Sequence, residues 1–207
     1  MMKFDKKQLL VYGITKTDTT FEMVEAALQG GATCIQLREK NMEHAMFVEK
    51  IQKMTKLCHA YHVPLIVDDD VDAALEGQAD GVHVGIEDES VASIRKRVPE
   101  NFIVGATAKT IEQAQIAKAQ GADYLGVGAI FPSPTKKNAI RITKEQLIEI
   151  RKSMDLPIVA IGGITYENMD ILQGVDVQGI AVVSALFGGN DTKARAEKLV
   201  EKVKEIL

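Results

Sequence analysis

The stretch GADYLGVGAIFPSPTKK, residues 121–137, decides how the rest of the chain is interpreted. Its first half contains Tyr124–Val127, a short apolar run that is typical of a strand covered on both faces in a parallel sheet. A segment of helical length and composition, Ile111–Gln120, precedes it. The Pro, Ser and Thr residues that follow predict a loop. A strand preceded by a helix and followed by a polar loop indicates a repeating βα architecture.

Seven more apolar runs extend this pattern over the whole chain. They are Leu9–Ile14, Cys34–Leu37, Leu65–Val67, Gly81–Val84, Phe102–Gly105, Ile158–Ile161 and Gly179–Val183. Amphipathic segments between them include Thr20–Gln29, Met42–His62 and Lys144–Met154. Eight βα units with no leftover segment favour one α/β domain over residues 1–207, a small (β/α)8 (TIM) barrel, over an open doubly wound sheet.

A weak internal repeat supports the barrel. Four related triplets precede the second, fourth, sixth and eighth runs, whereas prolines precede the third, fifth and seventh. The triplets are Gly31-Ala32-Thr33, Gln78-Ala79-Asp80, Gly121-Ala122-Asp123 and Gly174-Val175-Asp176. This alternation predicts paired βαβα pieces. The alternative is that glycine ends helices and proline blocks their continuation wherever they occur.

The composition of the chain excludes a disordered or a fibrous protein. Apolar residues make up 46% and charged residues 26% of the 207 residues, which is ordinary for a globular chain. We expect no membrane segment and no signal peptide, hence a cytoplasmic protein. The net charge of −4 argues against a nucleic-acid partner. Cys34 and Cys58 are expected to be buried free thiols.

Polar residues gather where the predicted strands end, which is where barrel enzymes place their active sites. Asp69 and Asp88 follow adjacent strands and could hold Mg²⁺, which takes one or two protein carboxylates. Alternatively, the run Asp68–Asp70 is a solvated turn or caps the next helix. Arg38 and Lys40 are two positions apart beyond a strand and suit a diphosphate.

Three further features point to phosphate, each with a simpler alternative. Lys136 lies in a loop that could close over the same phosphates, or it is a surface lysine. Gly162-Gly163 and Val183-Ser184 follow the seventh and eighth strands, the usual phosphate site of barrels. The glycines alternatively serve a tight turn only. His83 lies within a strand, where interior packing is the simpler expectation.

Together these segments resemble the thiamine phosphate synthase (thiamine-phosphate pyrophosphorylase) family. Seven motifs follow the family's order from about Leu10 to Gly188. They are QLREK, VDDDVDAAL, GVHVGIED, GATAKT, GADYLGVGAIFPSPTKK, PIVAIGGIT and VVSAL. The resemblance implies a (β/α)8 barrel that joins an aminopyrimidine-methyl diphosphate to a thiazole phosphate, giving thiamine monophosphate and pyrophosphate. Both substrates are small molecules, and a homodimer is expected only by analogy.

The resemblance also implies a role for each site residue. Asp69 and Asp88 would bind Mg²⁺ that bridges the diphosphate. Arg38, Lys40, Lys136 and Thr107 would be the catalytic residues. The implied substrate-binding residues are Gln36, Leu37, Arg38, Glu39, Lys40, Asp68, Thr107, Ser133, Pro134, Thr135, Lys136, Gly163, Val183 and Ser184.

Four positions depart from the family pattern. Asp68 stands where Asn is usual, Ile86 where Gln is usual, Thr107 where Ser is usual, and Ala129 where Pro is usual. Asp68 is the most consequential, because a further anion near a diphosphate should weaken binding unless it is protonated or turned toward a cation.

Other functions remain alternatives. Thiazole tautomerases, which are isomerases on the same barrel, carry a catalytic histidine near the end of the sixth strand, where this chain has Ala129. A barrel that binds ligands without catalysis is a second alternative. An epimerase would need a paired acid and base, which the sequence does not show.

Overall fold

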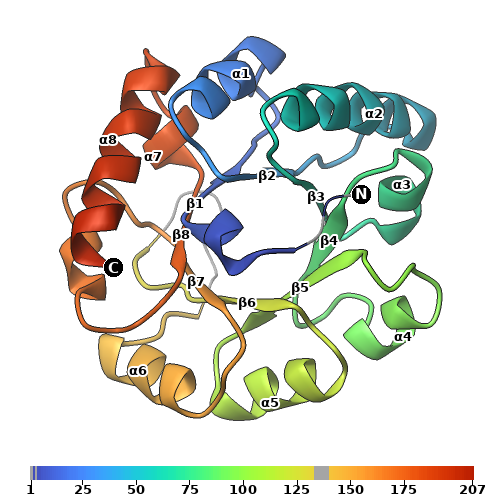
Figure 1. Ribbon diagram of the computed structural model, residues 1–207. Coiled ribbons are helices and arrows are strands. Elements are labelled where there is room, and N and C mark those ends of the chain that lie inside the picture. The colour runs from blue at the N-terminus through green and yellow to red at the C-terminus, as the bar shows by residue number, and fades with distance from the viewer. Residues whose placement is uncertain (1, 3, 133–139) are drawn as a thin grey trace.

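The computed structural model describes residues 2, 4–132 and 140–207. Eight parallel strands pair in chain order and close into a barrel, as the sequence predicts, and helices surround it (Figure 1). The strands are β1 Val11–Ile14, β2 Cys34–Leu37, β3 Leu65–Asp68, β4 Gly81–Val84, β5 Ile103–Ala108, β6 Tyr124–Val127, β7 Ile158–Ile161 and β8 Gly179–Val182.

Several helices begin directly after a residue whose side chain caps the first helical turn. Thr20 and Thr143, for example, accept hydrogen bonds from the backbone N–H groups of Met23 and Gln146. The helices are α1 Phe21–Gln29, α2 His44–Ala60, α3 Val71–Glu76, α4 Val91–Arg95, α5 Ile111–Ala119, α6 Lys144–Lys152, α7 Ser184–Phe187 and α8 Thr192–Ile206, with 3-10 helices η1 Lys6–Leu9 and η2 Met169–Leu172. Within the described part of the chain, no helix has the length and hydropathy needed to cross a bilayer.

Two predicted strands differ from the structure by two or more residues at one end, and three other strand ends differ by one residue. Leu9 belongs to η1, which Asp5 starts with a capping box, and β1 begins only at Val11. The apolar pair Leu9-Leu10 runs into the strand without a break, so hydropathy alone could not separate them. β5 continues past Gly105 to Ala108, which places Thr107 on the strand itself.

The internal repeat has a physical basis in side-chain bonds between neighbouring strands. The residue before each even strand accepts a hydrogen bond from a backbone N–H at the start of the preceding odd strand. The pairs are Thr33 with Val11, Asp80 with Leu65, Asp123 with Val104, and Gln178 with Ile158, at 2.7–2.9 Å. The fourth triplet is thus Asp176-Val177-Gln178, two residues later than predicted. Gly31, Gln78, Gly121 and Asp176 open the four triplets, all at positive φ.

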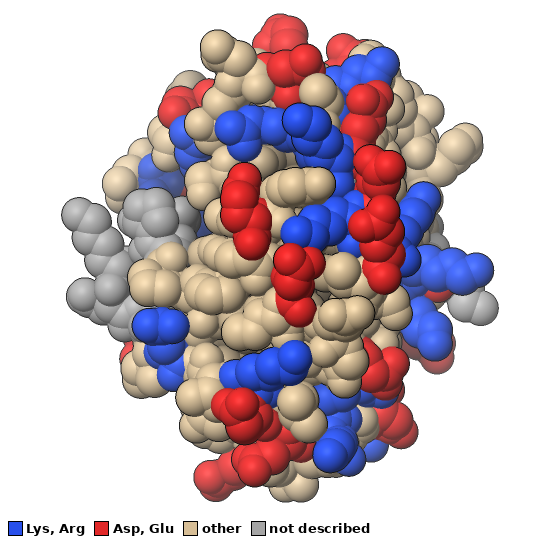
Figure 2. Space-filling view, turned by 90° about the vertical axis from the view of Figure 1, so that its left-hand side faces the viewer, with Lys and Arg blue, Asp and Glu red and all other residues tan. Residues whose placement is uncertain are grey.

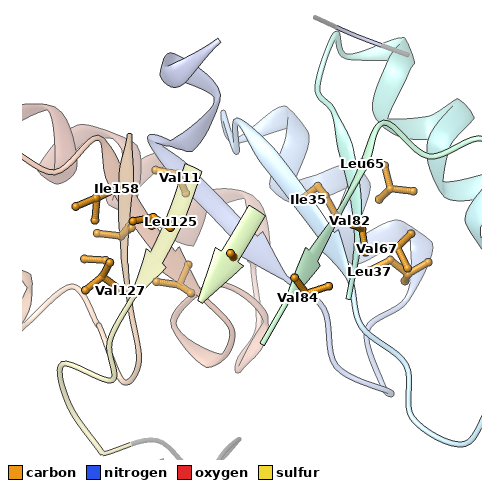
Figure 3. Packing of buried hydrophobic residues seen from close by; sticks show 14 of the residues in the cluster. Val11, Ile35, Leu37, Leu65, Val67, Val82, Val84, Leu125, Val127 and Ile158 are labelled. Atoms are coloured by element: carbon orange, nitrogen blue, oxygen red, sulfur yellow. The ribbon is translucent and has the colours of Figure 1, made fainter. Parts of the chain in front are cut away.

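Apolar side chains fill two separate layers. The larger lies between the strands and the outer helices and includes Val11, Ile35, Leu65, Val82 and Leu125 (Figure 3). The smaller layer lies inside the barrel and includes Tyr12, Cys34, Ile66, Ile103 and Tyr124. Both cysteines are buried and free, as predicted.

The amino ends of the strands are closed by the N-terminal segment. The Phe4 ring stacks on Tyr124, with ring centroids 5.8 Å apart. The backbone N–H of Met2 donates to Asp80, directly before β4. In Figure 1, η1 lies across this end of the barrel. The carboxyl ends of the strands are left as the face on which a site can form.

Two glycines inside the barrel make room for ring side chains. A Cβ at Gly105 would overlap the Tyr124 phenol, and one at Gly126 would lie 3.0 Å from Cε1 of His83. Gly105→Ala should therefore displace Tyr124 and lower the free energy of unfolding by about 1–3 kcal/mol. Urea denaturation measures this loss. Unchanged stability would show that the barrel can accommodate the methyl group.

Candidate active site

Arg38 and Asp68 form an ion pair across the ends of β2 and β3. The Arg38 Nε lies 3.0 Å from Oδ2 of Asp68, and both side chains are largely shielded from solvent. The backbone N–H of Arg38 donates to Oγ1 of Thr15, which follows β1. Asp68, the residue that departs most from the family pattern, is therefore turned toward a cation.

The three consecutive aspartates have three different roles. Asp68 pairs with Arg38. Asp69 has a φ of 63°, in the left-handed region that Asp tolerates better than most residues, and its N–H donates to the carbonyl oxygen of His83 on β4. Asp70 caps α3 by accepting a hydrogen bond from the N–H of Ala73. The capping alternative thus holds for Asp70, whereas Asp69 lies against the β4 side of the barrel.

Asp69 and Asp88 come together as the candidate metal pair. Their carboxyl groups share a hydrogen bond. Partial burial, the charge of Asp68 and this contact with Asp88 raise the pKa of Asp69 to about 7, against the opposing effect of Arg38. Asp88 is held in place because its Oδ2 accepts a 2.7 Å bond from the N–H of Gly85. The raised pKa of Asp69 thus reflects its burial first and the neighbouring carboxyl groups of Asp68 and Asp88 second.

This donor set fits Mg²⁺ better than a transition metal. Among residues 2, 4–132 and 140–207, no group of three or more His, Cys, Asp or Glu side chains could hold a metal. Two facing carboxylates match the share that proteins contribute to Mg²⁺, whose other positions are taken by water and phosphate oxygens.

The QLREK segment divides between the barrel interior, the outer layer and solvent. Gln36 is buried inside the barrel, and its Nε2 donates to the Tyr12 hydroxyl at 3.0 Å. The Leu37 side chain is buried in the layer under the helices. Glu39 forms an ion pair with Lys50 of α2. Lys40 is exposed. Arg38 thus lies at the barrel mouth in its ion pair with Asp68, whereas Glu39 anchors the segment to α2.

Thr107 lies at the mouth and connects to residues deeper in the barrel. Its Oγ1 is 3.1 Å from Nε2 of His83, whose Nδ1 is 3.1 Å from the Tyr124 hydroxyl. The prediction that His83 packs in the interior is confirmed. Tyr12 and Tyr124 could have been found from the sequence, because each occupies an inward-pointing position of an apolar strand, where a hydroxyl needs a partner.

The two glycines after β7 are required because the loops after β6 and β7 approach each other closely. Gly162 and Gly163 have φ values of 100° and 63°. A Cβ at Gly162 would meet Ala129, and one at Gly163 would meet Phe131. The tight-turn explanation is therefore correct in part, and it brings the loop after β6 against the loop after β7. Ile130 and Phe131 donate backbone hydrogen bonds to Ile161 and Gly162.

Val183 and Ser184 lie at the end of β8, where Val183 precedes the first turn of α7. A hollow of about 750 Å³ opens beside Ser184, between the loop after β7 and α8. Arg195 lines this hollow, and its guanidinium donates to the carbonyl oxygen of Ala185. On the face shown in Figure 2, basic and acidic side chains are interspersed.

Part of the predicted site lies outside the described residues. This part comprises Ser133, Pro134, Thr135 and Lys136, whose predicted roles stay predictions. Ile86, which replaces the family's usual Gln, is exposed near Asp88.

The closed parallel barrel carries a carboxylate pair, an arginine and a glycine loop at its strand ends, where (β/α)8 barrel enzymes form their active sites. Residues 10–186 match the family described as thiamine monophosphate synthase. The chain belongs to this family, and it is a transferase of thiamine biosynthesis.

Relatives cover nearly the whole chain. The thiamine-phosphate synthase of Methanobrevibacter smithii is 39% identical over 205 residues, which are 99% of this chain and 98% of that protein. The thiamine-phosphate synthase of Alkaliphilus oremlandii is 42% identical over 181 residues, 87% of each chain. A solved structure of thiamine phosphate pyrophosphorylase from Pyrococcus furiosus superposes with a TM-score of 0.91, at 39% identity and 98% coverage of both chains.

Proposed function

We propose that this chain joins 4-amino-2-methyl-5-hydroxymethylpyrimidine diphosphate to hydroxyethylthiazole phosphate, giving thiamine monophosphate and pyrophosphate. The observation that carries the proposal is the meeting of the Arg38–Asp68 ion pair and the Asp69–Asp88 pair at neighbouring strand ends, in a chain of this family. We further propose that residues 1–207 act as one domain.

Bond breaking comes first in the proposed mechanism. The electron-rich aminopyrimidine stabilises a cation on its methylene carbon, so the bond from that carbon to the diphosphate oxygen breaks and its electron pair leaves with pyrophosphate. Arg38 and Lys40 stabilise the charge that develops on the leaving group, with Lys136 as a further predicted contact. Asp69 and Asp88 would hold Mg²⁺, which when bound supplies further positive charge to the diphosphate oxygens.

Capture of the cation follows. The ring nitrogen of the thiazole donates its lone pair to the methylene carbon, and the new C–N bond completes thiamine monophosphate. Gly163, Val183 and Ser184, with residues 133–135, would hold the thiazole phosphate so that its nitrogen faces the cation before water does. Thr107 and Gln36 would hold the pyrimidine. No step needs a general base, which agrees with the lack of a base–nucleophile pair in the sequence.

A single assay tests this function. Purified protein is mixed with both substrates and Mg²⁺, and thiamine monophosphate is detected as its fluorescent oxidation product. Metal-dependent product supports the proposal. Binding of either substrate without product would instead favour a thiazole tautomerase or a non-catalytic ligand-binding barrel. The homodimer and the cytoplasmic location stay predictions, to be checked by gel filtration and cell fractionation.

Asp68→Asn should retain or improve activity. The change restores the residue usual in the family and removes one anion near the diphosphate, while the amide oxygen can still accept the hydrogen bond from Arg38. We expect kcat/KM between unchanged and about fivefold higher, a difference of roughly 1 kcal/mol or less. Steady-state kinetics in the pyrimidine diphosphate measure it. A loss of more than tenfold would show that this protein uses the carboxylate itself.

A further inference from the structure

Arg97 connects the two segments that carry the candidate metal ligands. It lies just after α4, and its guanidinium pairs with Asp72, in the first turn of α3, and with Glu89, in the loop after β4. Asp72 follows Asp69 by three positions in the chain. Glu89 directly follows Asp88. One arginine side chain therefore joins the segments on both sides of the Asp69–Asp88 pair.

The contact between Arg97 and Glu89 is bidentate. Nη2 of Arg97 donates to Oε2 of Glu89 at 2.6 Å, and Nε donates to Oε1 at 3.3 Å. Ser93 of α4 donates a further 2.7 Å hydrogen bond to the same Oε1. The Nη1 of Arg97 donates to Oδ1 of Asp72. Single exposed ion pairs contribute little, but a bidentate pair within a network of several charges can fix a geometry.

Each end of this network is coupled to one of the two candidate ligands. On one side, Asp70 caps α3, so the chain from Asp69 to Asp72 forms the start of a single helix. On the other side, Asp88 is held by the N–H of Gly85. A displacement of α3 from the loop after β4 would therefore change the separation of the two carboxylates.

We propose that Arg97 is a positioning residue for the Asp69–Asp88 pair, which holds α3 and the loop after β4 together so that both carboxylates are in place when a divalent cation binds. Arg97 acts through Asp72 and Glu89, and not through a contact with substrate or metal. The proposal rests on the proposed function for the identity of the cation, Mg²⁺. The network of hydrogen bonds does not depend on that function.

Positioning and electrostatics predict opposite effects when this arginine is lost. Arg97→Gln removes one positive charge from the neighbourhood of the site, and by Coulomb's law alone this loss favours a bound cation. Loss of the network instead lets the two segments separate, so part of the binding free energy is used to bring the carboxylates together. Weaker binding of a divalent cation is therefore the result that only positioning predicts.

The test measures the dissociation constant of Mn²⁺, which suits the same carboxylate and water ligands as Mg²⁺ and whose free form electron paramagnetic resonance detects. Wild-type protein, Arg97→Gln and Lys96→Gln are titrated without substrate at one pH and ionic strength. Lys96→Gln is the matched control, because it removes the same charge at the neighbouring exposed position.

Arg97→Gln should raise the Mn²⁺ dissociation constant by about three- to tenfold, whereas Lys96→Gln should leave it within about twofold of the wild-type value. Arg97→Lys keeps the charge but loses the bidentate contact, so it should also bind Mn²⁺ more weakly, and it serves as the test if Arg97→Gln does not fold. Wild-type affinity or tighter binding in these Arg97 variants would overturn the proposal.

A double-variant cycle tests whether Arg97 acts through Asp72. Asp72→Ala removes the contact to α3 together with one negative charge. Its effect on the Mn²⁺ dissociation constant should be at least about twofold smaller in Arg97→Gln than in the wild-type protein, because the contact is already lost there. Equal effects in both backgrounds would show that the two residues act independently and would overturn the proposal.

The synthase assay separates this proposal from the proposed function. For Arg97→Gln, the Mg²⁺ concentration at half-maximal rate should rise, while kcat at saturating Mg²⁺ stays within about twofold of wild type. A lower kcat with unchanged Mg²⁺ dependence would overturn the proposal. If the assay yields no product while Mn²⁺ binding agrees with expectation, the proposed reaction is wrong but the role of Arg97 stands. If the wild-type protein binds no Mn²⁺, the metal site and this proposal are both wrong.

Discussion

Asp69→Asn should lower Mg²⁺-dependent kcat/KM by about a thousandfold, equivalent to roughly 4 kcal/mol of transition-state stabilisation. The change removes the carboxylate whose pKa is raised to about 7 by burial and by the neighbouring Asp68 and Asp88. Without that charge, Asp88 alone would have to hold the proposed Mg²⁺ against competition from water. Steady-state kinetics over a range of Mg²⁺ concentrations should show both a lower kcat and a much weaker dependence on metal.

Loss of activity through unfolding can be distinguished from loss of metal. At pH 8, above the raised pKa, the Asp69 carboxylate is ionised and repels its neighbours, so Asp69→Asn should stabilise the metal-free protein by up to about 1 kcal/mol after solvent screening. Mg²⁺ should raise the melting temperature of the wild-type protein but not of the variant. Lower stability of the metal-free variant would contradict this account.

Asp70→Asn is the matched control for the same charge change one residue away. Asp70 caps α3, and Asn caps helices about as well as Asp. The kcat/KM of Asp70→Asn should change by less than about twofold, because the Asp70 carboxylate acts on Asp69 and Asp88 only through long-range electrostatics. A large loss in this variant would mean that the whole acidic run acts on the metal.

Arg38→Gln should lower kcat/KM by about a hundredfold or more. The variant would lose the proposed charge-assisted contact to the leaving pyrophosphate, and it removes the Arg38 partner of the shielded Asp68 carboxylate. The negative charge of Asp68, which Arg38 no longer balances, then repels the diphosphate. Kinetics in the pyrimidine diphosphate should therefore show a rise in KM together with a fall in kcat.

The double variant separates the two effects. Adding Asp68→Asn to Arg38→Gln removes the carboxylate that has lost its Arg38 partner, so it should restore part of the lost activity, about three- to tenfold. Strict additivity, with no recovery beyond the effect of Asp68→Asn alone, would show that Asp68 does not act through Arg38. Circular dichroism before assay confirms that the variants compared are folded.

Much of the fold could be predicted from the sequence because strand and helix patterns alternate over the whole chain. Six strands begin where the apolar runs begin, and capping residues such as Thr20, Thr110 and Thr143 locate helix starts within a residue or two. η1 was missed because a four-residue 3-10 helix has no hydrophobic period. β5 was cut short because Gly105, Ala106 and Ala108 carry little β signal around Thr107.

The site was harder to predict from the sequence because it depends on side-chain contacts between residues of different strands. Order along the chain placed Arg38, Asp69 and Asp88 at strand ends, but it could not show that Asp68 turns to Arg38 or that Asp70 caps a helix. The interior contact of Tyr12 with Tyr124 joins residues 112 positions apart. Only closure of the barrel brings these hydroxyl groups within bonding distance.

The side-chain bonds that open the odd strands also bear on how the chain can be divided. Each joins an odd strand to the segment leading into the next even strand. β1–β2, β3–β4, β5–β6 and β7–β8 are therefore pairs held by an additional side-chain hydrogen bond. The chain can therefore be cut in the connections before β3, β5 and β7 without separating two strands that one of these hydrogen bonds joins. New termini made by circular permutation should be tolerated there better than within a pair.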